Sequence, residues 1–97
     1  MNLDDLQRIM DETYGERDRS RGVPATIAWL TEELGELARA TRKESAEAQL
    51  HELGDVLAWL ASLANQLGLS LDDAVERYSL GCPRCGGRPC ECRERVP

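Results

Sequence analysis

The sequence predicts an all-α protein built around two long helices. Three observations support this fold class: apolar residues recur at helical spacing, Ala, Leu and Glu dominate the middle of the chain, and no segment shows the alternation of a strand. The chain has 97 residues, which allows one domain at most. We therefore expect one helical domain over residues 1–80, followed by a Cys-rich segment over residues 81–97.

The first helix is expected over about residues 3–14, because its apolar residues share one helical face. They follow an i, i+3, i+6, i+7 pattern: Leu3, Leu6, Ile9 and Met10. Gly15 is expected to end this helix, and the polar residues 15–23 are expected to form a loop. Pro24 is expected in the first turn of the second helix, because its missing N–H costs nothing there, and this helix should run to about Lys43.

Ser45 is placed to cap a third helix over about residues 46–67, because its side chain can accept from the first free backbone N–H groups. Gly68 is placed to end that helix in a left-handed conformation. Ser70, with Asp73 three residues later, predicts a short fourth helix that fades near residues 78–81. The short connection after Lys43 predicts that the two long helices pack as an antiparallel hairpin.

The core of this protein must be mainly aliphatic, because the chain has two Trp, two Tyr and no Phe. A chain of this length buries only roughly 60–65% of its unfolded surface, so an isolated monomer would be marginally stable. We expect oligomerisation or a structural metal to supply the missing stability. The predicted architecture is a helical hairpin plus two short helices, with a four-helix bundle completed by oligomerisation.

The formal net charge is −6, and it is unevenly distributed along the chain. Residues 1–80 hold 16 acidic and 8 basic residues, whereas residues 81–97 hold two acidic and four basic ones. An acidic body argues against binding of nucleic acid. No apolar run approaches the roughly 18–20 residues that cross a bilayer, and the N-terminus lacks the apolar stretch of a signal peptide. We expect a cytoplasmic protein that binds neither nucleic acid nor membrane.

Carboxylates gather on one face of the second helix. At about 100° per residue, Glu32, Glu33 and Glu36 lie within about 100° of one another. Trp29 falls inside the same arc, which is unusual for a face that is only solvated. A core stripe of Leu and Ala begins beside this face.

The third helix places carboxylates against its apolar side. Glu52 falls inside the apolar arc and Asp55 lies at its edge. A carboxylate in such a place is costly unless it is paired, protonated or metal-bound. The helix supplies no partner cation, because no Lys or Arg occurs between Glu44 and Arg77.

Two interpretations of these carboxylates compete. In the first, the glutamates of the second helix are a solvated face, and Glu52 bends from the margin of the core into water. In the second, the antiparallel hairpin brings the two groups together, and the cluster binds divalent cations. Ligand sets made only of oxygen favour Mg²⁺ or Mn²⁺ over zinc. The apolar setting of Glu52 and Asp55 favours the metal interpretation.

The two half-motifs resemble those of the MazG-like all-α nucleotide pyrophosphohydrolases. They read WLTEELGELA at residues 29–38 and ELGDVLAWL at residues 52–60. The similarity covers about residues 3–80, and the tail is similar to the Cys-rich ending of a small subgroup. EExxE alone is a weak signal, whereas the two spaced half-motifs on successive helices are fairly specific.

The resemblance implies Mg²⁺-dependent hydrolysis of a nucleoside triphosphate to a monophosphate and pyrophosphate. It implies a homodimer or a dimer of dimers in which subunits share a bundle. The metal ligands that it implies are Glu33, Glu36, Glu52 and Asp55. Glu32 would bind a further metal or orient the attacking water, and either Glu32 or Glu33 is the catalytic base.

Substrate contacts are expected from side chains outside the carboxylates. Trp29, Asn65 and Arg77 are the first candidates, and Arg77 stands where many family members carry several basic or amide residues. Three further cations could meet phosphates or simply be surface charges: Arg17, Arg21 and Lys43. Base and sugar preference do not follow from these residues.

The four cysteines are candidate zinc ligands: Cys82, Cys85, Cys90 and Cys92. A C-x₂-C turn with following glycines is typical of a zinc knuckle, although the C-x₄-C-x-C continuation is tighter than a usual zinc ribbon. Two disulfides or a reduced, unstructured tail are the alternatives. His51 is assigned to neither site. If the carboxylates bind no metal, the alternative function is a non-catalytic helical interaction module whose zinc tail binds a protein.

Overall fold

The computed structural model describes residues 1–95 and confirms the all-α fold class within that range. The last two residues of the predicted tail segment, Val96 and Pro97, lie outside the described residues. The helices are α1 (Leu3–Arg21), α2 (Val23–Lys43), α3 (Ala46–Leu67) and α4 (Leu71–Val75), followed by the 3₁₀ helix η1 (Glu76–Tyr78). Within residues 1–95, no helix is both long enough and apolar enough to span a membrane.

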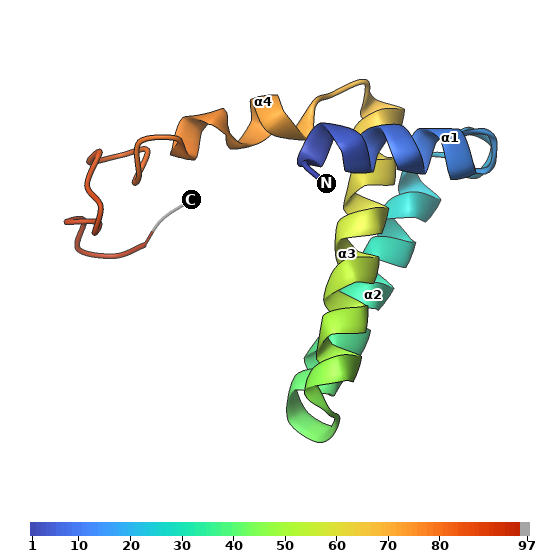
Figure 1. The fold of residues 1–97 in the computed structure, drawn as a ribbon, viewed down its shortest axis with the longest axis horizontal. Helices are drawn as coiled ribbons and strands as arrows, with labels where there is room; N and C mark the ends of the chain where they lie inside the picture. Colours follow the sequence, from blue (N-terminus) through green and yellow to red (C-terminus); the bar gives the residue numbers. More distant parts are fainter. Residues whose placement is uncertain (96–97) are drawn as a thin grey trace.

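Helices α2 and α3 form the predicted antiparallel hairpin (Figure 1). Helix α1 crosses the open end of that hairpin and packs mainly on α3 (Figure 1). Helix α4 contacts α1 and leads the chain away from the hairpin toward the Cys-rich tail (Figure 1). The molecule is therefore an open arrangement of helices, with principal extents of 43 × 36 × 26 Å.

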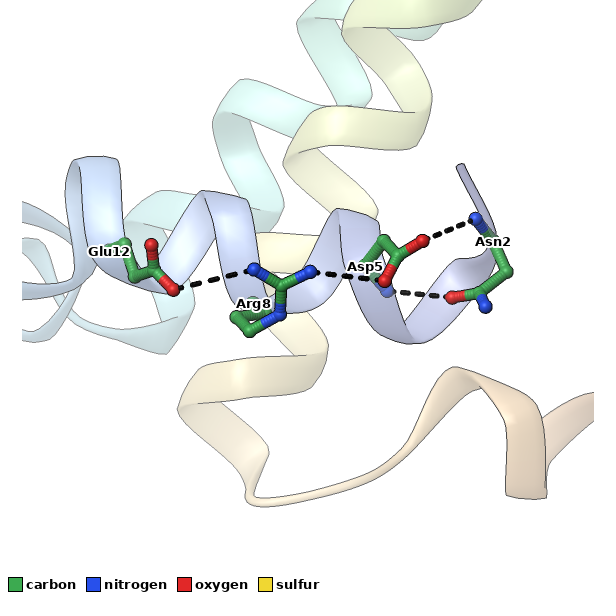
Figure 2. Close-up of polar contacts among 4 residues, drawn as sticks. All are labelled: Asn2, Asp5, Arg8 and Glu12. Carbon is green, nitrogen blue, oxygen red and sulfur yellow. Dashed lines mark hydrogen bonds and ion pairs between the residues drawn. The ribbon is translucent and has the colours of Figure 1, made fainter.

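Helix α1 begins with a side-chain cap that the sequence analysis did not identify. Asn2 Oδ1 accepts from the Asp5 backbone N–H at 2.8 Å, and Asp5 Oδ2 accepts from the Asn2 N–H at 3.1 Å (Figure 2). Arg8 then pairs with Asp5 and, one turn later, with Glu12 (Figure 2). The backbone N–H of Asn2 and the Arg8 guanidinium both hold the pKa of Asp5 below its ordinary value.

The predicted end of the first helix at Gly15 is wrong, because α1 continues to Arg21. Gly15 is buried where an ion pair crosses it: Arg19 Nη1 lies 3.2 Å from Asp11 Oδ1. A Cβ at position 15 would come within 2.6 Å of that carboxylate oxygen, so glycine makes room for the pair. The helix ends instead at Gly22, whose φ of 89° lies in the region that favours glycine.

The predicted boundaries of the later helices are confirmed. Ser45 Oγ accepts from the Ala48 N–H at the start of α3, and Ser70 Oγ accepts from the Asp73 N–H at the start of α4. Gly68 ends α3 with a left-handed φ of 68°. These ends are set by local backbone chemistry, which is why the sequence predicts them.

The register of the hairpin is defined by contacts along its inner seam. Near its open end, Gln66 Nε2 donates to Thr26 Oγ1 at 2.7 Å. Near its closed end, Gln49 Nε2 donates to the Ala40 carbonyl at 3.3 Å. Among the residues that the structure describes, the buried hydrophobic side chains are small, namely Ala40, Ala61 and Ala64. Several leucines of the two helices remain exposed.

Candidate functional site

The middle of the hairpin seam brings carboxylates from both long helices together. The neighbours that act on Glu33 of α2 are Asp55 and Glu52 of α3 and Glu36 of its own helix. Burial is the largest cause that raises the pKa of Glu33, and the charge of Asp55 is the next. The nearby Glu52 side chain and the charges of Glu52 and Glu36 raise it further. These four residues are the metal ligands that the family resemblance implies.

Local helix geometry explains why these side chains meet. Glu33 and Glu36 are one turn apart on α2, and Glu52 and Asp55 are one turn apart on α3, so each pair lies on one helix face. The antiparallel register then places the two pairs opposite each other. Glu32, one position earlier on α2, is exposed, and the interactions that join the other four do not include it.

His51 lies on the flank of this carboxylate cluster. Its Nε2 atom is 3.3 Å from Asp55 Oδ2, and His51, Glu52 and Asp55 each place one possible ligand atom within 4.8 Å of the others. The sequence analysis left His51 unassigned. Its spacing from Asp55, one helical turn, was the available signal.

Aromatic rings stack beside the carboxylates. Trp29 of α2 and Trp59 of α3 lie with ring centroids 5.9 Å apart and ring planes 11° from parallel. The guanidinium of Arg21 lies over the Trp59 ring, 4.8 Å from its centroid. This contact is a cation–π interaction, so Arg21 is held at the end of an aromatic stack.

Asp18 of α1 also fixes the position of Arg21, through an ion pair. Its carboxylate is buried, with 3% of the residue exposed, and Oδ1 accepts from Arg21 Nη1 at 2.6 Å. The second oxygen, Oδ2, is buried without a hydrogen-bond partner. The sequence does not indicate a role for Asp18, because residues 15–23 have the composition of a loop, whereas Asp18 lies within α1.

A cavity of about 260 Å³ lies between α1 and α3 and connects these features. Its lining includes Asp55 from the carboxylate cluster and Trp59 from the aromatic stack. It also includes the acid and the two arginines of α1: Asp18, Arg17 and Arg21. An acidic cluster, two cations and an aromatic surface therefore line or adjoin one hollow.

The structure places the remaining candidate substrate residues elsewhere. Both amide atoms of Asn65 bond to Gln7: Nδ2 donates to the Gln7 carbonyl at 2.8 Å, and Oδ1 accepts from Gln7 Nε2 at 3.0 Å. Arg77 lies in η1, with its guanidinium 5.1 Å from the Tyr78 ring centroid. Lys43 ends α2 at the closed end of the hairpin, away from α1 (Figure 1).

The four cysteines also come together, in a second place. Their sulfur atoms all lie within 4.8 Å of one another. They belong to the segment after η1, and the carboxylate cluster belongs to the hairpin. Within residues 1–95, two groups of side chains could therefore hold a metal ion: the four cysteines, and His51 with Glu52 and Asp55 at the carboxylate cluster.

The fold and the candidate site together define an all-α protein whose helical hairpin carries facing carboxylate pairs. Residues 21–80, more than half of the chain, match the MazG nucleotide pyrophosphohydrolase domain. The chain therefore belongs to the MazG nucleotide pyrophosphohydrolase family.

Two relatives from Bacillus subtilis (strain 168) support this membership. The chain is 35% identical to "Uncharacterized protein YvdC" over 95 residues, covering 80% of this chain and 90% of that protein. It is 37% identical to "Uncharacterized protein YpjD" over 86 residues, covering 77% of this chain and 78% of that protein. These names describe no activity.

Proposed function

We propose that this protein is a Mg²⁺-dependent nucleoside triphosphate pyrophosphohydrolase. Water would attack the α-phosphorus of an NTP or dNTP, the bond to the bridging oxygen would break, and NMP and pyrophosphate would leave. One observation carries this proposal: carboxylates of α2 and α3 meet beside a cavity that also holds arginines and an aromatic ring. The family match supports the same reaction class.

The carboxylate cluster fits a divalent cation. Its donors are carboxylate oxygens, which suit Mg²⁺ or Mn²⁺. The raised pKa of Glu33 shows that its charged form is disfavoured by burial and by its acidic neighbours, a cost that a cation would remove. The residues that would hold the metal are Glu33, Glu36, Glu52 and Asp55. A bound Mg²⁺ would supply charge neutralisation at phosphate oxygens and a lower pKa of bound water.

The cavity offers contacts for the two ends of a nucleotide. Arg17 and Arg21 would bind phosphate oxygens, and arginine is suited to this because its planar fork matches phosphate geometry. Trp29 and Trp59 supply an aromatic surface next to Arg21. Asp18 acts through Arg21 and is a positioning residue. These contacts offset the overall negative charge of the protein where an anionic substrate must approach.

The cavity volume suggests that a second copy of the chain contributes to the site. At about 260 Å³ it falls just below the roughly 300–1,000 Å³ of small-molecule sites. A homodimer or a dimer of dimers would enclose the hollow and cover the exposed leucines of α2 and α3. The proposed proton acceptor for the attacking water is Glu33 or Glu32, since both stand on the same stretch of α2.

The test is pyrophosphate release from a panel of NTPs and dNTPs with Mg²⁺ or Mn²⁺. We expect turnover of at least one nucleotide, and loss of at least about 100-fold in Glu36→Gln and Glu52→Gln. Partners outside the ligand set already cost about 10–100-fold when mutated, so a ligand should cost more. The matched control is Glu47→Gln, an exposed glutamate in the first turn of α3, which should retain activity.

Each variant should keep the wild-type circular dichroism spectrum, so that lost activity is not lost folding. If no nucleotide turns over with either cation, the catalytic proposal is overturned and the non-catalytic interaction module gains. If Glu36→Gln and Glu52→Gln stay fully active, catalysis occurs but does not depend on this cluster.

A further inference from the structure

The Cys-rich tail contains four sulfur atoms with the spacing of a metal tetrahedron. Cys82 and Cys92 Sγ are 3.8 Å apart, Cys85 and Cys90 Sγ are 3.9 Å apart, and all four lie within 4.8 Å of one another. With zinc–sulfur bonds of about 2.3 Å, the edges of a regular ZnS₄ tetrahedron are about 3.8 Å. All four cysteines are free thiols in the structure.

The backbone around the thiols is folded into a tight turn. The Gly86 N–H donates to the Cys82 carbonyl at 2.7 Å, and the Cys82 N–H donates to the Gly87 carbonyl at 3.0 Å. Gly86 has a φ of 73°, and a Cβ at Gly87 would lie 2.6 Å from the Pro89 carbonyl oxygen. Glycine at both positions therefore lets the chain return close enough for the second pair of cysteines to meet the first.

Backbone N–H groups point at the sulfur atoms. Cys85 Sγ accepts from the Gly87 N–H at 3.3 Å and from the Glu91 N–H at 3.4 Å, and Cys90 Sγ accepts from the Cys92 N–H at 3.3 Å. Such bonds orient a thiolate and stabilise its charge.

Charge and composition point to the same conclusion. Four thiolates and one Zn²⁺ carry a net charge of −2, and residues 81–97 carry four arginines against two glutamates. Two of these arginines, Arg88 and Arg95, line the same hollow as Cys82, Cys90 and Cys92. Residues 82–95 contain no aliphatic or aromatic side chain apart from proline, so apolar burial cannot hold them in this shape.

We propose that Cys82, Cys85, Cys90 and Cys92 bind one Zn²⁺ in a closed tetrahedral site that folds the tail. Metal binding supplies the folding free energy that this segment lacks. The site is structural, because four protein ligands leave no open position for water or substrate. It is separate from the carboxylate cluster and independent of the proposed enzymatic activity.

The test is metal analysis of the full chain after purification in a reducing buffer. We expect one zinc per chain by native mass spectrometry and by elemental analysis. After exchange of zinc for Co²⁺, we expect the visible bands of tetrahedral cobalt and the charge-transfer bands of cobalt–thiolate bonds. A reduced chain that takes up neither zinc nor Co²⁺ would overturn the proposal, and so would a purified chain whose cysteines form two disulfides.

Paired variants separate the two metal-binding groups. The double substitution Cys85→Ser with Cys90→Ser should lose the zinc, whereas Glu33→Gln with Glu36→Gln should keep it. Retention in the cysteine variant, or loss in the glutamate variant, contradicts the assignment. Circular dichroism should show the same helix content in both.

Proteolysis tests whether the zinc folds the tail. With zinc bound, trypsin should cut slowly after Arg84 and Arg93, and chelation should speed both cuts by at least about 10-fold, since cleavage follows the open population. Helices α1–α3 should stay intact under the same conditions. Equal cleavage rates with and without chelator would show that zinc does not order the segment.

Discussion

Glu33 shows the electrostatic cost of bringing several carboxylates together. It is surrounded by Asp55, Glu52 and Glu36, and its pKa is raised above its ordinary value of 4.5. A carboxyl with a raised pKa in the folded state holds its proton more tightly there than in the unfolded chain. Its contribution therefore favours folding below about pH 4.5 and is lost as the pH rises through the folded-state pKa.

This electrostatic cost leads to a prediction for Glu33→Gln. Without divalent metal at neutral pH, the variant should melt at a higher temperature than wild type, because one repelling charge has gone. With saturating Mg²⁺ the order should reverse, because wild type gains binding energy and the variant loses a ligand. Thermal melts in EDTA and in MgCl₂, at pH 4 and pH 7.5, measure both effects.

In EDTA the difference between Glu33→Gln and wild type should shrink from pH 7.5 to pH 4, since Glu33 is then increasingly protonated. Glu47→Gln serves as the control and should follow wild type under all four conditions. A variant that melts like wild type in both EDTA and Mg²⁺ would show that Glu33 neither repels its neighbours nor binds the metal.

The side chains that position Arg21 show why some site residues escape sequence analysis. Asp18 and Arg21 are three residues apart on α1, and Arg21 reaches the Trp59 ring on α3. The pairing of Glu33 with Asp55 follows from helix angles and a short loop, both of which can be read from the sequence. The approach of α1 to α3 depends on contacts between residues that lie far apart in the sequence, such as Arg21 and Trp59. The helical spacing of apolar residues does not predict such contacts.

At the scale of whole helices, one glutamine connects three segments. Gln7 on α1 donates from Nε2 to Asn65 Oδ1 and to the Leu69 carbonyl, and Oε1 accepts from the Leu71 N–H at 2.7 Å. The Gln7 carbonyl also accepts from Asn65. This side chain joins α1 to the end of α3 and the start of α4. Asn65 therefore has a structural role in these contacts.

Gln7→Ala should destabilise the protein because it removes three side-chain hydrogen bonds and leaves the Leu71 N–H without its acceptor. We expect a loss of about 1–3 kcal/mol in the free energy of unfolding. Urea denaturation followed by circular dichroism measures it. Glu12→Ala, on the exposed face of α1, should change stability by no more than about 0.5 kcal/mol. Equal effects of the two substitutions would refute the role of Gln7 as a connector.

The helices themselves divide into those that the sequence predicts well and one that it does not. The ends of α3 and the start of α4 depend on Ser45, Gly68 and Ser70, whose local chemistry is the same in a peptide and in the fold. The sequence predicts too short an α1, because a glycine after an amphipathic stretch normally indicates a helix end. Gly15 instead lies beneath the ion pair of Asp11 and Arg19, a contact that only the folded helix reveals.

As a whole molecule, the chain is too open for a compact monomer of its size. Its radius of gyration is 15.6 Å, compared with about 13 Å for a compact domain of 100 residues. Its accessible surface is 7263 Å², whereas a compact protein of 10.8 kDa exposes roughly 5,500 Å². The excess surface is consistent with a chain that forms its core together with other copies.

We propose that another copy of the chain covers the exposed leucines of α3. They follow a 3-4 spacing, which is the seam pattern of helical bundles. The stripe, which we name the leucine stripe, comprises Leu50, Leu53, Leu57, Leu60 and Leu67, between 37% and 72% exposed. On α2, Ile27 and Leu34 are exposed to a similar degree. A second hairpin on this face would complete the predicted four-helix bundle.

Leu57→Glu tests this face, because it places a charge in the middle of the leucine stripe. Burying a leucine contributes about 1.5–3 kcal/mol, and a symmetric dimer loses that twice. The dissociation constant should therefore rise by at least about 100-fold. Light scattering across a concentration series should show a dimer or larger assembly for wild type and a monomer for Leu57→Glu.

Leu80→Glu is the matched control for Leu57→Glu, because Leu80 is 80% exposed but lies after η1, outside the leucine stripe. It should assemble like wild type. A wild-type protein that remains a monomer at all concentrations would contradict the shared bundle, and an unchanged mass for Leu57→Glu would place the interface elsewhere.

The cavity between α1 and α3 is small for a nucleotide, so we expect dissociation of the assembly to lower pyrophosphate release as well. Leu57→Glu should therefore lose activity, even though Leu57 does not line that cavity.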